Sequence, residues 1–88
     1  MTYRVEIETA ARRQMKSLPL GVAAKIDTAV RALANEPRPR GCRQMIGYPN
    51  TYRLRVSDYR VLYRIHDDIL VILVVRVGHR REVYRHMG

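Results

Sequence analysis

Apolar and polar residues alternate over two stretches of the chain. Near the N-terminus, charged residues separate Tyr3, Val5 and Ile7. Residues 51–65, TYRLRVSDYRVLYRI, alternate in the same way on both sides of a Ser-Asp pair. Because successive side chains of a strand point to opposite faces, the first stretch predicts a short strand. The second predicts a hairpin with one apolar face and one arginine-bearing face.

Helical spacing appears between these two stretches. Residues 10–18 predict a short helix, with Thr9 as its cap. Residues 20–34 carry apolar side chains at intervals of three and four, which predicts a longer amphipathic helix ending near Asn35. The link between the two helices is very short. We therefore expect an αα-hairpin packed on one face of the sheet.

Two further strands are expected. Residues 42–46 are a weak candidate, whereas residues 69–77, ILVILVVRV, predict a central strand covered on both faces and ended by Gly78. The complete order is β-α-α-β-β-β-β. This order predicts an α+β fold in which an N-terminal strand and an αα-hairpin precede an antiparallel β-meander, within a single domain spanning residues 1–88.

The predicted hairpin brings like charges together. If Ser57 and Asp58 are its two loop residues, Arg55 falls opposite Arg60, and Arg53 lies on the same face. Like charges directly opposite each other destabilise a sheet by up to about 1 kcal/mol, and an anion bound between them removes this cost. Two alternatives stay open: an ordinary solvated arginine face, and a longer loop, because the turn lacks the glycine that such hairpins favour.

Composition supports a polyanionic partner. The chain has 17 Lys+Arg against 8 Asp+Glu, a formal net charge of +9, and only two of the cations are lysines. Arginine binds phosphate with a planar fork of donors. The chain has a single cysteine, so no disulfide is expected within it, and no residues have the spacing of metal ligands. We therefore expect no metal and no cofactor. The N-terminus has no apolar signal core and the longest apolar run is too short for a membrane span, so we expect a cytoplasmic protein.

A second basic cluster, HRREVYRH, follows the long apolar run. The preceding strand is expected to lie beside the arginine-bearing hairpin, so this cluster should meet the hairpin on the face opposite the helices. Tyr84 within it has the alternative of a core aromatic residue. His79 and His86 are isolated and have the alternative of ordinary surface residues.

In this order, YRLRV (52–56), DYRVLYRI (58–65) and VGHRREVY (77–84) resemble the RelE/ParE superfamily, specifically the RelE-type toxins of bacterial toxin–antitoxin pairs. The αα-hairpin and the turn at residues 47–49 also fit, so the resemblance covers essentially the whole chain. It implies a ribosome-dependent endoribonuclease that cuts mRNA in the A site by metal-independent attack of the 2′-hydroxyl. It also implies a cognate acidic, RelB-like antitoxin as partner.

The resemblance also implies roles for individual residues. Arg53 and Arg55 match the paired basic residues, Arg60 the transition-state arginine, Arg80 the residue that protonates or stabilises the leaving group, and Tyr84 the tyrosine that stacks on or orients the substrate. Candidate RNA contacts are Arg43, Arg64, Arg81 and Arg85, and candidate proton carriers are His79 and His86. The general base stays unassigned, because arginine is a very poor proton acceptor.

Two other functions remain possible on this sequence. One is a ParE-like poison of DNA gyrase on the same fold. The other is a non-catalytic basic module that binds nucleic acid or only an antitoxin.

Overall fold

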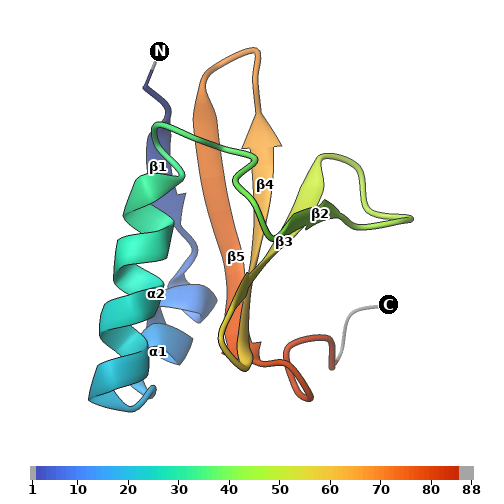
Figure 1. The fold of residues 1–88 in the computed structure, drawn as a ribbon. Coiled ribbons are helices and arrows are strands. Elements are labelled where there is room, and N and C mark those ends of the chain that lie inside the picture. Colours follow the sequence, from blue (N-terminus) through green and yellow to red (C-terminus); the bar gives the residue numbers. More distant parts are fainter. Residues whose placement is uncertain (1, 86–88) are drawn as a thin grey trace.

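The computed structural model describes residues 2–85 and confirms the α+β architecture (Figure 1). Within these residues, two helices and five strands follow one another in the predicted order. They are β1 (Arg4–Ile7), α1 (Thr9–Lys16), α2 (Leu20–Ala32), β2 (Cys42–Gln44), β3 (Thr51–Val56), β4 (Tyr59–His66) and β5 (Val71–His79). Helix α2 is followed by a turn that precedes the first of two prolines, Pro37 and Pro39.

All the strands join one sheet, in the order β1-β5-β4-β3-β2. The β2–β3, β3–β4 and β4–β5 pairs are antiparallel, while β1 pairs with β5 in parallel. The last strand is therefore flanked on both sides, which accounts for its long apolar run. The first strand closes this side of the sheet and makes it mixed rather than wholly antiparallel.

Both helices pack on one face of the sheet, as expected from the αα-hairpin (Figure 1). The core between the layers contains Ile26 and Val30 from α2, and Val61, Tyr63 and Ile72 from the strands, each at most 2% exposed. Tyr3, Val5 and Ile7 pack against its margin. The alternation seen in the sequence thus assigns the apolar side chains of β1, β3 and β4 to the helix side. The arginines of β3 and β4 lie on the opposite face.

The β3–β4 hairpin has the register expected from a two-residue loop. Arg55 pairs with Arg60, Arg53 with Leu62, and Val56 with Tyr59. The longer loop considered as an alternative is not formed. In place of a glycine, Ser57 adopts a left-handed backbone with φ of 53°. This conformation is uncommon for a residue with a side chain.

Several predicted boundaries are wrong by a few residues. Thr9 is the first residue of α1 rather than its cap; Glu8 occupies the cap position and makes no side-chain capping bond. The second helix ends at Ala32, with Leu33 rather than Asn35 at its C-cap. The last strand starts at Val71, because Leu70 has a φ of 54° that belongs to the turn, and it continues through Gly78 to His79.

A bulge interrupts the β4–β5 pairing. Leu62 pairs with Arg76, but the next residue, Tyr63, pairs with Val74, so one extra residue is inserted in β5. A bulge of this kind reverses the alternation of faces beyond it. As a result, Val74 and Val77 both enter the core although they are three residues apart. Within residues 2–85, no helix is long and apolar enough to cross a membrane.

Candidate functional site

Two pairs of arginines lie side by side on the sheet face opposite the helices. The β2–β3 ladder places Arg43 directly opposite Arg53, and the β3–β4 ladder places Arg55 opposite Arg60. The second pair was expected from the sequence. The first pair was not, because Arg43 comes from a weak strand beyond a separate loop. Opposed like charges repel, so this arrangement destabilises the sheet unless an anion binds between them.

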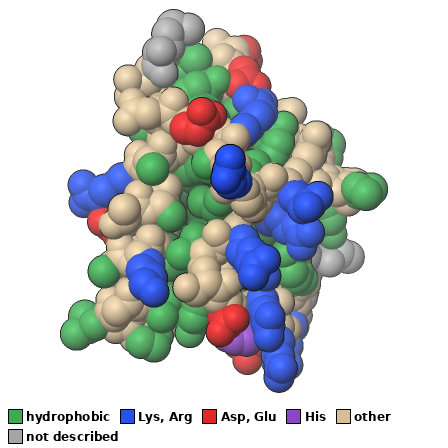
Figure 2. Space-filling model, in the orientation of Figure 1, with side chains coloured by type: hydrophobic (Ala, Val, Ile, Leu, Met, Phe, Trp, Pro, Cys, Tyr) green, Lys and Arg blue, Asp and Glu red, His purple; other side chains and the backbone are tan. Residues whose placement is uncertain are grey.

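These four side chains surround a single hollow. A cavity of about 130 Å³ is lined by Gly41, Arg43, Arg53, Arg55 and Arg60. The lining contains no acidic side chain, so none of it neutralises the arginines. In Figure 2, blue Lys and Arg side chains are most numerous in the right half of the view, on the strand side of the molecule away from α2. The hollow therefore concentrates positive charge and hydrogen-bond donors, which is the chemistry of a phosphate site.

Arg60 is the arginine most firmly held in this hollow. Its Nη1 donates to the backbone carbonyls of Ser57 at 3.1 Å and Tyr59 at 2.9 Å. The side chain is half-buried as a result, while Arg55 opposite it is exposed. Both bonds use the same nitrogen, so Nε and Nη2 are available to donate to an anion. A guanidinium fixed in this way is suited to stabilise a negative charge that develops in a reaction.

The C-terminal basic cluster meets the hairpin, as the sequence predicted. After β5, the backbone N–H of Arg80 donates to the carbonyl of Asp58 in the β3–β4 turn at 2.7 Å. The Arg80 guanidinium lies 4.0 Å from the Asp58 carboxylate and is exposed. Further along, Nη1 of Arg53 donates to the hydroxyl oxygen of Tyr84 at 3.2 Å. Tyr84 is therefore half-buried at the arginine site rather than part of the helix-side core.

A second hollow adjoins the first. It has a volume of about 230 Å³ and is lined by Arg53, Tyr84 and residues 44–46 at the end of β2. Arg53 borders both hollows. The two together form a continuous surface with cations at one end and an aromatic ring at the other. Single-stranded nucleic acid offers matching groups, a phosphate and a base.

The remaining candidate RNA contacts lie around this site rather than in it. Arg64 is exposed on the arginine face, opposite Thr51 and Leu73, and does not line either hollow. Arg81 and Arg85 are exposed on the C-terminal segment. Long cationic side chains in such positions can contact neighbouring phosphates of a bound strand.

His79, one of the two expected proton carriers, lies on the other side of the sheet from the arginine hollow. His79 pairs with Tyr59 on the helix side of the sheet, with ring centroids 5.5 Å apart in an edge-to-face arrangement. Its Nδ1 accepts a hydrogen bond from the backbone of Arg81 at 3.2 Å. His79 is thus turned away from the arginine hollow. This placement argues against the proton-carrier role expected for it; His86 lies outside the described residues.

Sequence reasoning missed Arg76. The bulge in β5 turns this residue to the arginine face, opposite Leu62. Its Nη1 donates to the carbonyl of Val83 at 3.2 Å and also to that of Arg85. One signal was present in the sequence, because Arg76 is the single charged residue within the run ILVILVVRV.

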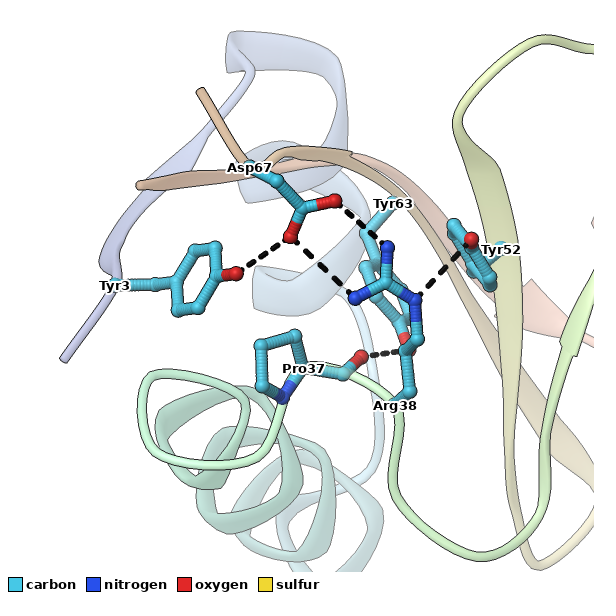
Figure 3. Close-up of polar contacts among 6 residues, drawn as sticks. All are labelled: Tyr3, Pro37, Arg38, Tyr52, Tyr63 and Asp67. Carbon is cyan, nitrogen blue, oxygen red and sulfur yellow. Dashed lines mark hydrogen bonds and ion pairs between the residues drawn. The ribbon is translucent and has the colours of Figure 1, made fainter. Parts of the chain in front are cut away.

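A separate polar cluster holds the connector between α2 and β2 (Figure 3). Arg38 makes an ion pair with Asp67 at 2.8 Å, donates to the hydroxyl of Tyr52 at 3.2 Å, and lies 5.1 Å from the centre of that ring. Asp67 also accepts a hydrogen bond from Tyr3. The bond from Arg38, followed by that from Tyr3, lowers the pKa of Asp67.

The buried end of this cluster is Tyr63. Its hydroxyl donates to the carbonyl of Pro37 at 2.8 Å and lies 3.1 Å from the sulfur of Cys42. Burial, and then the contact with Cys42, raises the pKa of Tyr63. The connector is therefore tied to β4 at its start, and Cys42 begins β2 beside the same hydroxyl. This anchoring sets where β2, and with it Arg43, enters the sheet.

Comparison with known proteins shows which family this chain resembles. Residues 5–84 match the sequence model of the ParE toxin of the type II toxin–antitoxin system parDE. Toxin RelG of Mycobacterium tuberculosis is 36% identical over 86 residues, covering 97% of this chain and 99% of the relative. The mRNA interferase toxin RelE of Escherichia coli is 28% identical over 88 residues, which cover 96% of this chain and 92% of the relative.

Solved structures show the same fold. The toxin in the RelBE2 toxin–antitoxin complex of M. tuberculosis has a TM-score of 0.78 and 33% identity, covering 91% of this chain and all of that one. The archaeal RelE–RelB complex of Pyrococcus horikoshii gives a TM-score of 0.81 and 30% identity, covering 94% of this chain and 100% of the other. With a sequence match over nearly its whole length and these structural matches, the chain belongs to the RelE/ParE family of type II toxin–antitoxin toxins.

Proposed function

We propose that this toxin is a ribosome-dependent endoribonuclease that cleaves mRNA in the A site. The observation that carries the proposal is the hollow lined by four arginines, with Tyr84 bonded to one of them. Support also comes from a relative that is named an mRNA interferase, the RelE toxin of E. coli. In the proposed reaction the 2′-hydroxyl attacks the adjacent phosphate, leaving a 2′,3′-cyclic phosphate and a 5′-hydroxyl.

The arginine hollow suits the charge changes of this reaction. As the 2′-oxygen attacks, negative charge builds on the non-bridging oxygens of the phosphate. Fixed donors aimed at such charge are usually the largest single contribution to catalysis. Arg60 is the best held of these donors, while Arg53 and Arg55 lie beside it on β3. The role proposed for Arg80, whose backbone is bonded to the Asp58 turn, is to stabilise or protonate the leaving 5′-oxygen.

Tyr84 positions the substrate in this proposal. Its oxygen accepts a hydrogen bond from Arg53, which leaves its own O–H free to donate to a phosphate oxygen. Its ring borders the second hollow, where a base can stack. The arginines stabilise charge and do not accept the proton of the 2′-hydroxyl. That proton passes to a group outside the described arginine cluster, such as a substrate phosphate oxygen or a ribosomal group.

A cognate antitoxin is the second partner. The similar structures from M. tuberculosis and P. horikoshii are toxin–antitoxin complexes, the second with RelB. We propose that this chain binds a small acidic antitoxin of that kind. The charge of +9 favours an acidic partner, and a disordered segment that folds on the toxin would bury a large surface.

The test is cleavage in a translation extract. Wild-type toxin should generate new mRNA 5′ ends within ribosome-bound codons, and these are mapped by primer extension. A variant carrying Arg53→Ala and Arg60→Ala should still bind ribosomes but leave the mRNA intact. As a charge-matched control, Arg12→Ala with Arg13→Ala removes two exposed cations from α1. Arrest of translation by the wild type with intact mRNA would refute the proposal.

A gyrase poison remains the second candidate, because the matching sequence model is that of a ParE toxin. In this case, cells expressing the toxin would accumulate cleaved gyrase–DNA complexes while their mRNA stayed intact. The third possibility, a non-catalytic binding module, predicts no cleavage of either nucleic acid. Its RNA affinity would fall steeply with salt, and each phosphate-binding arginine removed would lower that salt slope by about 1.

A further inference from the structure

Arg76 lies in an unusual environment for a cation. It is half-buried on a strand whose neighbours are aliphatic, and it faces Leu62 across the β4–β5 ladder. Without the bulge, Arg76 would share the face of Ile72 and Val74, which is the helix-side core. The bulge instead delivers its guanidinium to the arginine face. Among the described residues, no carboxylate lies within ion-pairing distance of Arg76.

The partners of Arg76 are backbone carbonyls on either side of Tyr84. Nη1 donates to the oxygen of Val83 at 3.2 Å and to that of Arg85. The Val83 side chain is 2% exposed and packs over Gly78, where an added Cβ would lie 3.6 Å from it. The C-terminal segment is therefore held against the sheet by a cation and an apolar contact. Arg53 holds the Tyr84 hydroxyl independently.

We propose that Arg76 is a positioning residue that fixes Tyr84 over the RNA site. It acts through the backbone on both sides of the ring and does not touch the substrate. This inference rests on the proposed endoribonuclease function. If Tyr84 orients the scissile phosphate, loosening the segment misplaces it. A misplacement of about 1 Å can lower a reaction rate by about 100-fold.

The kinetic test is a double-mutant cycle with single-turnover cleavage of ribosome-bound mRNA. Arg76→Ala should lower the cleavage rate by about 10- to 100-fold, with little change in the toxin concentration needed for half-saturation. Arg76→Lys, which keeps the charge and can reach one carbonyl, should recover part of the rate. In a Tyr84→Ala background, Arg76→Ala should have little further effect. Arg12→Ala controls for the loss of one charge.

A second measurement does not depend on cleavage. The amides of Val83 and Arg85 donate to His79 and Glu82 within the held segment. Arg76→Ala should speed their hydrogen exchange and shift the Tyr84 ring signals in NMR spectra, while amides of β3 and β4 stay protected. If the wild type does not cleave RNA, the proposed function fails but this structural result can still hold. Additive effects in the cycle, or unchanged exchange at these amides, would overturn the positioning role.

Discussion

Arginine has two different roles in two regions of this molecule. Arg38 is surrounded by partners: a carboxylate, a tyrosine hydroxyl and the face of the same ring. Arg43, Arg53, Arg55 and Arg60 line a hollow that contains no acidic side chain. A paired arginine stabilises a fold locally, whereas clustered unpaired arginines cost stability and attract an anion. The difference in partners separates an anchoring region from a binding region.

The largest effect should come from removing an arginine of the hollow. Arg60→Ala should lower the rate of mRNA cleavage by about 10²- to 10³-fold, because it removes a fixed donor at the developing charge. Arg38→Ala removes the same charge from the paired region and should lower the rate much less, because it acts on the hollow only through the anchoring of the connector before β2. Single-turnover cleavage of ribosome-bound mRNA compares the two. Equal losses in both variants would mean that only total charge matters.

A smaller effect is expected on stability at the paired region. Tyr63→Phe leaves the Pro37 carbonyl without its buried donor and should lower the free energy of unfolding by about 1 kcal/mol. The matched change Tyr52→Phe removes a more exposed hydroxyl that accepts from Arg38 and should cost less. Urea denaturation measures both. A greater loss for Tyr52→Phe than for Tyr63→Phe would contradict the view that Tyr63 anchors the connector.

The smallest effect is the pH dependence of the paired region. The pKa of Asp67 is lower in the folded protein than in the unfolded chain. Its contribution to folding stability is therefore fully present above the unfolded pKa, near 4, and is lost as the pH falls through the folded pKa. Asp67→Asn should therefore flatten the acid side of a plot of melting temperature against pH.

On the alkaline side the sign is reversed. The hydrogen bond to Asp67 raises the pKa of Tyr3 in the folded protein. The contribution of Tyr3 to folding stability is therefore fully present below the unfolded pKa, about 10, and is lost as the pH rises through the folded pKa. Tyr3→Phe should flatten this side and leave the acid side partly intact. If Arg60→Ala altered either side as strongly, the two arginine regions would not be energetically separate.

Much of the arginine face was predictable from local sequence. Alternation with a period of two assigned Arg53, Arg55 and Arg60 to one face, and a loop of two residues fixed their register. The side of His79 was not predicted, because the last strand was expected to end at Gly78 and to be covered on both faces; the structure extends it to His79. The start of β5 was predicted two residues too early, and this error also has a local cause. The left-handed turn at Leu70 is not evident in a continuously apolar run.

The sequence by itself determined the order of elements, the two faces of the β3–β4 hairpin and the positive charge of one of them, since these follow from near-neighbour spacing. Only the tertiary structure decided which distant groups meet. Arg43 faces Arg53 because the connector is anchored far away, at Tyr63 and Asp67. Tyr84 reaches Arg53 because a bulge turns Arg76 outward to hold the C-terminal segment. Such contacts depend on the summed geometry of several elements, which no local pattern encodes.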